Sequence, residues 1–197
     1  MINNQLIENN QSKRFFDLTL AILTLLLFIL PMICLALLVF FSSKGPVFYW
    51  SDRVGLLGNN FKMPKFRTML IDTPAVATHL LDNPDAHLSP IGGFLRRMRL
   101  DELPQLWRVL KGDMSFVGPR PALFNQEDLI MLRSQHGVDK LLPGITGWAQ
   151  VNGRDELSIP KKVELDKEYL NNQSFWLDIK ILWMTLKKVI RHHDVSH

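Results

Sequence analysis

The longest apolar run in the chain lies near its N-terminus. From Leu18 to Phe41 the sequence LTLAILTLLLFILPMICLALLVFF carries no charged residue over 24 positions. A helix rises about 1.5 Å per residue, so a straight helix of this length covers about 36 Å, enough to cross a bilayer. A cleaved signal peptide has a shorter apolar core followed by small residues. We therefore predict a membrane helix over residues 13–44, behind a polar N-terminal tail at residues 1–12.

Pro31 lies near the middle of this run. A proline inside a helix removes one backbone hydrogen bond and kinks the helix, and the carbonyls that it frees need another partner in hydrocarbon. Positive charges flank both ends of the run: Lys13 and Arg14 before it, Lys44 and Arg53 after it. Cationic flanks favour the cytoplasmic face. The pattern leaves two topologies open, a re-entrant hairpin bent at Pro31 and a straight single-pass helix with a tolerated proline. Asp17, at the mouth of the run, is expected to pair with an arginine nearby or in the next domain.

The rest of the chain, residues 45–197, alternates short apolar patterns with turn signals. This arrangement predicts a small α+β domain that is mostly helical with short strands. Leu103, Leu106, Trp107 and Leu110 recur at helical spacing, and Gly112 is a natural stop. The expected elements are a strand at 47–50, a turn at 55–60, an extended basic segment at 61–69, a mobile loop at 72–90, helices at 91–99, 101–111, 125–140 and 161–171, a rigid turn at 117–121, and a loop with a short strand at 142–154.

Residues 175–191, FWLDIKILWMTLKKVIR, form the most amphipathic segment. One face is expected to carry Phe175, Trp176, Ile179, Leu182, Trp183, Leu186 and Ile190, with the cations Lys180, Lys187, Lys188 and Arg191 away from it. A basic amphipathic helix with tryptophans is typical of a membrane interface. A helix that only closes the core would show the same pattern, so both interpretations stand.

Charge and cysteine content narrow the class of partner. The chain of 197 residues has a net charge of +4 and one cysteine, so an intrachain disulfide is excluded and an anionic partner is favoured. Phospholipid headgroups, a nucleotide and nucleic acid all satisfy that description. The sequence has no zinc-finger spacing, aromatic RNA-binding signature or helix-turn-helix pattern, and nucleic acid is therefore not expected.

The segment 96–106, RRMRLDELPQL, carries the most informative chemistry. Arg96, Arg97 and Arg99 precede two adjacent carboxylates, Asp101 and Glu102, at a predicted helix start. Backbone N–H groups and the helix dipole at such a position bind phosphate and keep a carboxylate ionised. An ionised Asp101 can attack phosphorus as a covalent nucleophile, while Glu102 orients it or holds Mg²⁺. Simple capping of a helix by an acidic pair is the plainer interpretation.

Further cations extend this patch. Arg120 stands between Pro119 and Pro121, where a rigid turn would fix its guanidinium for bidentate recognition of phosphate or a base. Lys62, Lys65 and Arg67 add three cations within nine residues. Each of these three, taken alone, is more often ordinary solvated surface charge than part of a site.

From Lys13 to Thr185 the chain resembles the bacterial sugar transferase family, and within it the small monotopic phosphoglycosyl transferases of the Campylobacter type. The resemblance rests on KRFFD at 13–17, GPVFYWSDRVG at 45–55, KFRTM at 65–69, LDELPQL at 100–106, GDMSFVGPRP at 112–121, PGITGWAQVNGR at 143–154 and LDKEYLNNQSFWLDIKI at 165–181.

The resemblance implies a membrane enzyme that moves a sugar 1-phosphate from a UDP-sugar to undecaprenyl phosphate and releases UMP, as the first membrane step of glycan assembly. It implies that Asp101 is the nucleophile of a covalent phosphosugar intermediate, with Glu102 as its partner and Mg²⁺ as cofactor at these two carboxylates. It assigns Arg96 to polyprenyl phosphate. Nucleotide-sugar ligands would be Arg120, Lys62, Lys65, Arg67 and Arg154.

The resemblance also favours the re-entrant hairpin at Pro31, with the catalytic domain on the cytoplasmic face of the bacterial inner membrane and downstream glycosyltransferases as possible partners. Three positions depart from the family pattern. Ser51 stands where glutamine is common and Arg99 where Ser or Thr is common. Leu30 replaces a serine before the hairpin proline, which removes a hydroxyl that would satisfy a freed carbonyl.

Two other functions remain to be distinguished from the transferase. One is a membrane-anchored phosphohydrolase that uses the same acyl-phosphate chemistry with water as acceptor. The other is a non-catalytic adaptor whose basic patch binds anionic lipid. The segment NGRDELSIPKKVELD, residues 152–166, looks more like members that act on N-acetylated amino sugars than like hexose 1-phosphate enzymes.

Overall fold

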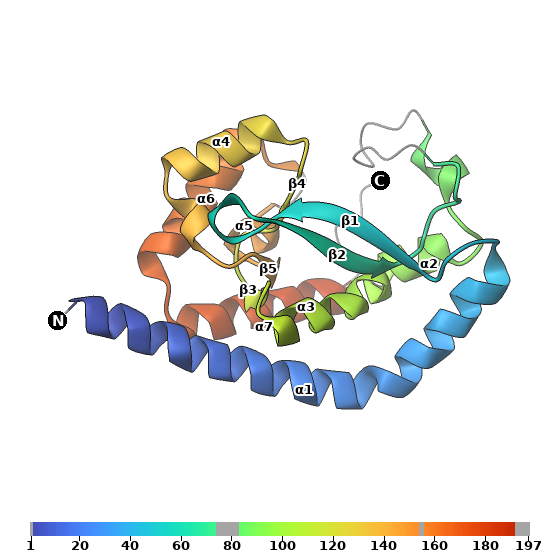
Figure 1. Ribbon diagram of the computed structural model, residues 1–197, viewed down its shortest axis with the longest axis horizontal. Coiled ribbons are helices and arrows are strands. Elements are labelled where there is room, and N and C mark those ends of the chain that lie inside the picture. The colour runs from blue at the N-terminus through green and yellow to red at the C-terminus, as the bar shows by residue number, and fades with distance from the viewer. Residues whose placement is uncertain (1, 74–82, 154–155, 192–197) are drawn as a thin grey trace.

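The computed structural model describes residues 2–73, 83–153 and 156–191 (Figure 1). The helices are α1 (Ile2–Ser42), α2 (Gly92–Arg97), α3 (Leu106–Lys111), α4 (Glu127–Gln135), α5 (Trp148–Val151), α6 (Ile159–Asn172) and α7 (Phe175–Arg191). The 3-10 helices are η1 (Leu56–Gly58), η3 (Pro84–His87), η4 (Leu100–Gln105) and η5 (Val138–Lys140). The strands are β1 (Phe48–Val54), β2 (Asn60–Phe66), β3 (Ser115–Val117), β4 (Ala122–Leu123) and β5 (Gly144–Thr146). A mostly helical α+β fold with short strands is thereby confirmed.

The long helix α1 runs along the base of the molecule, beneath the other elements (Figure 1). It begins at Ile2, so the residues expected as a separate polar tail are its first turns, and it continues through Pro31 without a break. Figure 1 shows that the helix curves along its length. Within the described residues, Gln11–Ser42 is the one helix long and apolar enough to cross a membrane, and only 11% of its most apolar window is buried. A core helix of this length would be covered on most sides.

Two small sheets organise the domain above α1. In the first, β1 pairs antiparallel with β2, from Phe48 opposite Phe66 to Val54 opposite Asn60, and its far edge pairs with β4. In the second, β3 and β5 run parallel, with Ser115 opposite Gly144. The main core lies among α1, β2, α3, β3, α6 and α7 and is centred on Ala21, Met63, Val109, Met114, Tyr169 and Ile181. A second cluster joins the later part of α1, through Leu35 and Val39, to Phe66 and Leu95.

The segment KRFFD, residues 13–17, fixes the early part of α1 to three elements at once. Lys13 Nζ lies 2.5 Å from Asp178 Oδ2 on α7. Arg14 donates to the Val109 and Leu110 carbonyls at the C-terminal end of α3, at 2.6 and 2.8 Å, where a helix carries its negative end. Asp17 is 1% exposed and accepts a hydrogen bond from the Phe116 backbone N–H on β3. The expected arginine partner of Asp17 is thus replaced by a backbone amide.

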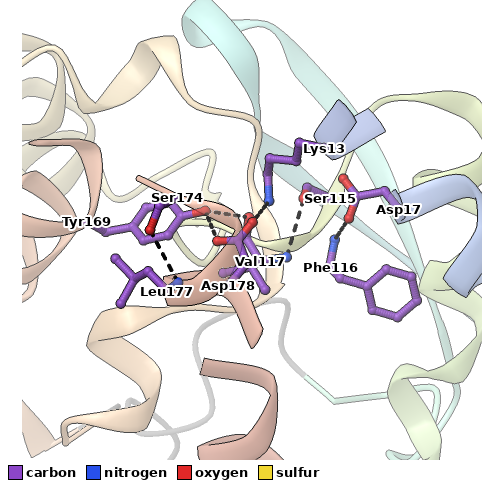
Figure 2. A network of polar contacts seen from close by, with 9 residues as sticks. All are labelled: Lys13, Asp17, Ser115, Phe116, Val117, Tyr169, Ser174, Leu177 and Asp178. Carbon is purple, nitrogen blue, oxygen red and sulfur yellow. Dashed lines mark hydrogen bonds and ion pairs between the residues drawn. The ribbon is translucent and has the colours of Figure 1, made fainter. Parts of the chain in front are cut away.

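Figure 2 shows how the Lys13–Asp178 pair continues into the domain. The other carboxylate oxygen of Asp178 accepts from the Tyr169 hydroxyl at 2.7 Å, and that hydroxyl also lies 3.3 Å from the Val117 carbonyl. Burial, reinforced by the Asp178 charge, raises the pKa of Tyr169, which keeps the hydroxyl protonated as a donor. Ser174 caps α7 by accepting from the Leu177 N–H. One part of the anchor of α1 therefore continues through Asp178 and Tyr169 to the Val117 carbonyl on β3.

The far end of α1 is held by Arg67, which is 5% exposed. Its guanidinium donates to the Ser43 carbonyl at 2.7 Å and to the Lys44 carbonyl. Gly45 follows with φ of 117°, and a Cβ at this position would meet the Arg67 side chain. Glycine is required here by both the backbone conformation and the close approach. Both ends of the apolar run are consequently bonded to the same domain.

Several helices begin or end at other residues than the sequence predicts, and local features of the chain explain the differences. The helix predicted over 125–140 ends at Gln135, because Gly137 adopts a positive φ of 72°, and η5 follows it. The helix predicted from Asp101 starts as the 3-10 helix η4, which contains Pro104, and becomes α-helical at Leu106. The short helix α5 appears where a loop was expected, and it is built of residues that include good helix formers. Residues 74–82 of the expected loop lie outside the described residues.

Helix α7 has the predicted bounds, but its aromatic face is not the face that closes the core. The buried side carries Asp178 and Ile181, with Thr185 bonded to Thr146 at 2.7 Å. Phe175, Trp176, Trp183 and Leu186 are half or more exposed. Helix α7 therefore does close part of the core, through its other side, and leaves these four side chains exposed.

The anchor network generates a stability prediction. We expect Lys13→Met to lower the free energy of unfolding by about 3 kcal/mol, because it leaves the 5%-exposed Asp178 carboxylate without its cation. Lys161→Met removes an exposed ion pair of 2.8 Å on α6 and should cost less than about 1 kcal/mol. Chemical unfolding of the detergent-solubilised chain measures both values. The double variant Lys13→Met/Asp178→Asn should recover part of the loss. Equal losses of stability in Lys13→Met and Lys161→Met would contradict the role of Lys13 as an anchor of α1.

Candidate functional site

The acidic pair lies where η4 packs against the hairpin strand β2. Asp101 is 8% exposed, and the Glu102 side chain is 11% exposed. Arg99, immediately before η4, has a left-handed backbone with φ of 56°, a conformation that costs a non-glycine residue energy. The acidic pair thus begins a tight 3-10 turn rather than a regular α-helix.

Glu102 is the centre of an ion-pair group. Its Oε1 atom accepts from Lys65 Nζ at 2.8 Å and from Arg120 Nη2 at 3.0 Å. Burial alone would raise the pKa of Glu102, but the charges and hydrogen bonds of Lys65 and Arg120 outweigh it and hold the pKa well below its ordinary value. Glu102 is therefore a permanent carboxylate that fixes two cations.

Asp101 has the opposite electrostatic environment. Burial raises its pKa above the ordinary aspartate value, the Glu102 charge adds to this, and Lys65 and Arg96 only partly oppose it. The expected stabilisation of the ionised form by a helix dipole is not the dominant effect, because burial is larger and η4 is only 6 residues long. Neighbouring carboxylates with pKa values pushed apart are typical of functional sites.

The turn Pro119–Pro121 holds Arg120 through its backbone carbonyls. Gly144 N–H donates to the Pro119 carbonyl at 2.9 Å, Arg133 Nη1 to the Arg120 carbonyl at 2.7 Å, and Arg53 Nη1 to the Pro121 carbonyl at 3.1 Å. Two of the three residues are prolines with fixed φ. The turn expected over 117–121 begins after Val117, which lies in β3, and these three hydrogen bonds hold its carbonyls in addition to the constraint from the proline rings.

Arg96 approaches the acidic pair from α2. Its Nε donates to Thr68 Oγ1 at 2.9 Å. Burial lowers its pKa, while the charges of Asp101 and Asp85 raise it. Arg96 therefore belongs to the electrostatic environment of Asp101, and Thr68 fixes its orientation.

The structure separates the other predicted cations. Strand alternation places Lys65 toward Glu102 and leaves Lys62 exposed. Arg67 donates instead to the Ser43 and Lys44 carbonyls that follow α1. Asp17 and Pro31 lie on α1, and Arg154 lies outside the described residues.

The sequence analysis did not assign Arg53 to the charged residues around Glu102 and Arg120, where the structure places it. Arg53 Nε donates to Ser51 Oγ at 2.9 Å. Burial, followed by the neighbouring Arg120 charge, lowers the pKa of Arg53 to about 10. The signal was available, because Ser51 and Arg53 share one face of a strand whose hairpin partner carries Lys65 on the same side.

The carboxylate pair fits a hard divalent cation. Mg²⁺ binds through one or two carboxylates together with substrate phosphate oxygens, and Asp101 and Glu102 supply adjacent oxygen donors. No cluster of three or more His, Cys, Asp or Glu residues occurs within the described part of the chain.

The chain matches known proteins over nearly its whole length. The sequence profile of the bacterial sugar transferase family matches residues 8–192. An uncharacterised sugar transferase, EpsL of Bacillus subtilis, is 43% identical over 178 residues, which cover 90% of this chain and 87% of EpsL.

Two longer relatives have names that state a reaction. The Escherichia coli UDP-glucose:undecaprenyl-phosphate glucose-1-phosphate transferase is 43% identical over 188 residues, or 91% of this chain and 40% of that protein. The Aeromonas hydrophila UDP-N-acetylgalactosamine-undecaprenyl-phosphate N-acetylgalactosaminephosphotransferase is 35% identical over 187 residues, or 90% and 43%. The chain spans about two fifths of each of these two.

Proposed function

The chain belongs to the bacterial sugar transferase family, and from that premise we propose that it transfers a sugar 1-phosphate from a UDP-sugar to undecaprenyl phosphate. The observation that carries the proposal is the buried Asp101 beside Glu102, with Lys65 and Arg120 fixed on Glu102 and Arg96 next to Asp101. Relatives named for this reaction match nine-tenths of the chain. The names of the relatives do not favour a phosphohydrolase.

The proposed reaction has two displacements at one phosphorus. An oxygen of the Asp101 carboxylate attacks the β-phosphorus of the UDP-sugar, the bond from that phosphorus to the bridging oxygen breaks, and UMP leaves with that oxygen. An oxygen of undecaprenyl phosphate then attacks the same phosphorus and releases Asp101 as a carboxylate. The raised pKa of Asp101 suits this role, because a more basic carboxylate is a stronger nucleophile once it is ionised.

The cations around the acidic pair would bind different phosphates. Lys65 and Arg120, which Glu102 holds beside Asp101, would neutralise the diphosphate, and that neutralisation is the main requirement of phosphoryl transfer. Arg96 on α2, whose orientation is fixed by Thr68, would bind the acceptor phosphate. Mg²⁺ held by Asp101 and Glu102 would supply further neutralisation of phosphate charge.

The two anchors of α1 support a re-entrant membrane topology. Residues 13–17 and 43–44 both bond to the catalytic domain, and the apolar run between them is largely uncovered. A hydrocarbon core is about 30 Å thick, so a helix that crossed it would put its two ends on opposite sides. One domain bonded to both ends favours entry and exit at the same face, with the bend at Pro31 and the domain on the cytoplasmic side of the inner membrane.

The exposed aromatic side chains of α7 fit this placement. Phe175, Trp176 and Trp183 project from the domain, and Lys187 Nζ lies 4.8 Å from the Trp183 ring centre. Aromatic and cationic side chains on one helix favour the headgroup region of a bilayer. We infer that α7 lies in the interface and helps to hold the acidic pair at the depth of a lipid phosphate.

The donor is proposed to be an N-acetylated amino sugar attached to UDP. The supporting feature is the segment 152–166, which resembles members of that specificity. Relatives named for glucose and for N-acetylgalactosamine both match, so both donors belong in the tests.

Intact-mass measurement tests the covalent step. After incubation with Mg²⁺ and each UDP-sugar, the wild-type chain should gain the mass of one sugar phosphate, and the gain should disappear on addition of undecaprenyl phosphate. Asp101→Asn should show no gain. Asp113→Asn, which alters a carboxylate paired with Arg108 at the surface, should behave as wild type.

The same incubations separate the alternatives. A phosphohydrolase would release UMP and free sugar phosphate in the absence of the lipid acceptor. A non-catalytic adaptor would release no UMP with any donor, and that result would refute the proposed function.

The pKa of Asp101 gives a pH prediction. Attack requires the ionised carboxylate, and a raised pKa means that activity is lost on acidification at a pH above the ordinary aspartate value of about 4. Lys65→Met removes the charge that most lowers this pKa, so the acidic limb of kcat/KM should move up by about one pH unit. Lys62→Met, on the opposite face of the same strand, should leave the limb in place. A limb that moves equally in both variants would contradict the assignment.

A further inference from the structure

A buried ion pair between α4 and α6 is bonded to the turn that carries Arg120. Asp166 on α6 is 1% exposed, and the side chain of Arg133 on α4 is 12% exposed. Arg133 Nε and Nη2 both donate to Asp166 Oδ2, at 3.0 and 2.7 Å. The third nitrogen, Nη1, donates to the Arg120 carbonyl at 2.7 Å. Arg133 therefore uses all three of its guanidinium nitrogens to join α6 to the turn.

Packing between α4 and α6 does not require this ion pair. Leu129 on α4 and Val163 on α6 belong to one buried apolar cluster. Burial raises the pKa of Asp166 above its ordinary value, although the Arg133 charge opposes this effect, so burial costs the carboxylate more than pairing returns. Apolar side chains of similar volume are often at least as stabilising as a buried ion pair. The pair therefore adds little to stability, and its geometry is the property that needs a reason.

Arg120 is the one residue of the Pro119–Pro121 turn whose φ no ring fixes. The following proline restricts it to extended conformations but leaves a range within them. The carbonyl that Arg133 binds belongs to the peptide between Arg120 and Pro121, so this hydrogen bond fixes the orientation of that peptide. The Arg120 side chain starts from the same residue and contacts Glu102 Oε1 at 3.0 Å. A change in the backbone of Arg120 would therefore displace its guanidinium from Glu102.

We propose that Arg133 is a positioning residue: held by Asp166, it fixes the backbone of Arg120 and so directs the Arg120 guanidinium to the acidic pair. The inference rests on the proposed function, in which Arg120 neutralises the donor diphosphate. Arg133 acts through Arg120 and not on the substrate. Because the diphosphate is broken in the first displacement and UMP leaves there, a displaced Arg120 slows the first displacement more than the second.

The double variant Arg133→Met/Asp166→Val separates positioning from stability. It replaces the ion pair with two apolar side chains of similar total volume, so its unfolding temperature should be no lower than that of wild type. UMP release in the presence of Mg²⁺ gives kcat/KM for the UDP-sugar, which reports the first displacement, and for undecaprenyl phosphate, which reports the second. The donor value should fall at least tenfold and the acceptor value less than twofold. An ion pair that only joined two helices would leave both values unchanged in this variant.

Arg133→Lys covers the case in which the double variant fails to fold. A lysine keeps the positive charge beside Asp166, but its single nitrogen cannot reach both the carboxylate and the Arg120 carbonyl in the geometry of the guanidinium. The donor kcat/KM should fall at least fivefold, with the acceptor value again changed less than twofold. Arg108→Lys makes the same change at an arginine that pairs with Asp113 through one nitrogen, and it should keep both wild-type values.

Phenylglyoxal, which modifies arginine guanidinium groups, reports the position of Arg120 without turnover. Peptide mass mapping of the detergent-solubilised full chain should show Arg120 modified at least threefold faster in Arg133→Lys than in wild type, because its contact with Glu102 is weakened. The rate in Arg108→Lys should equal that of wild type.

Three results would each overturn the positioning role: equal losses for donor and acceptor, a wild-type donor kcat/KM in the folded double variant, or an unchanged modification rate of Arg120. Failure of the proposed function has a separate readout, the absence of UMP release from every UDP-sugar. In that case the modification rates still decide whether Arg133 positions Arg120.

Discussion

The ion-pair group on Glu102 is the constraint on which the site depends. A carboxylate buried to this degree is stable only when its charge is compensated, and Lys65 and Arg120 provide that compensation from two separate elements. Because Lys65 and Arg120 both contact Glu102 Oε1, the β1–β2 hairpin and the Pro119–Pro121 turn are held against η4 at a defined distance. The same contact leaves Asp101 as the carboxylate with the raised pKa. The packing of the site and the reactivity of Asp101 therefore both depend on Asp101 and Glu102 having pKa values shifted in opposite directions.

The membrane helix imposes a second constraint on this group. Arg14 bonds to the last carbonyls of α3, and α3 continues directly from η4, which carries the acidic pair. At the other end, Arg67 bonds to the residues that follow α1, and Thr68 beside it orients Arg96. One anchor of α1 thus contacts the helix that continues from the acidic pair, and the other lies next to the residue that orients Arg96. In the proposed topology, the depth of the helix in the bilayer sets the depth of the chemistry.

The sequence predicted the elements better than the roles of their charges. The spacing of apolar residues located α6 and α7, because a helix leaves a local pattern in the sequence. Lys62, Lys65 and Arg67 looked equivalent as neighbouring cations, but strand alternation and the distant carbonyls of Ser43 and Lys44 gave them different positions. Arg53 served only as a flanking charge, because its contact with Pro121 spans 68 residues.

Arg120 joins these constraints at one residue. Its guanidinium is fixed by Glu102 and its carbonyl by Arg133, so it cannot move toward a ligand on one side without changing contacts on the other. In the proposed function, a diphosphate would compete with Glu102 for the Arg120 side chain. Movement of Arg120 toward the diphosphate would remove part of the compensation that keeps the buried Glu102 charge stable. Donor binding and the charge on Glu102 would then be interdependent, and Lys65 would remain as the cation that holds the β1–β2 hairpin against η4.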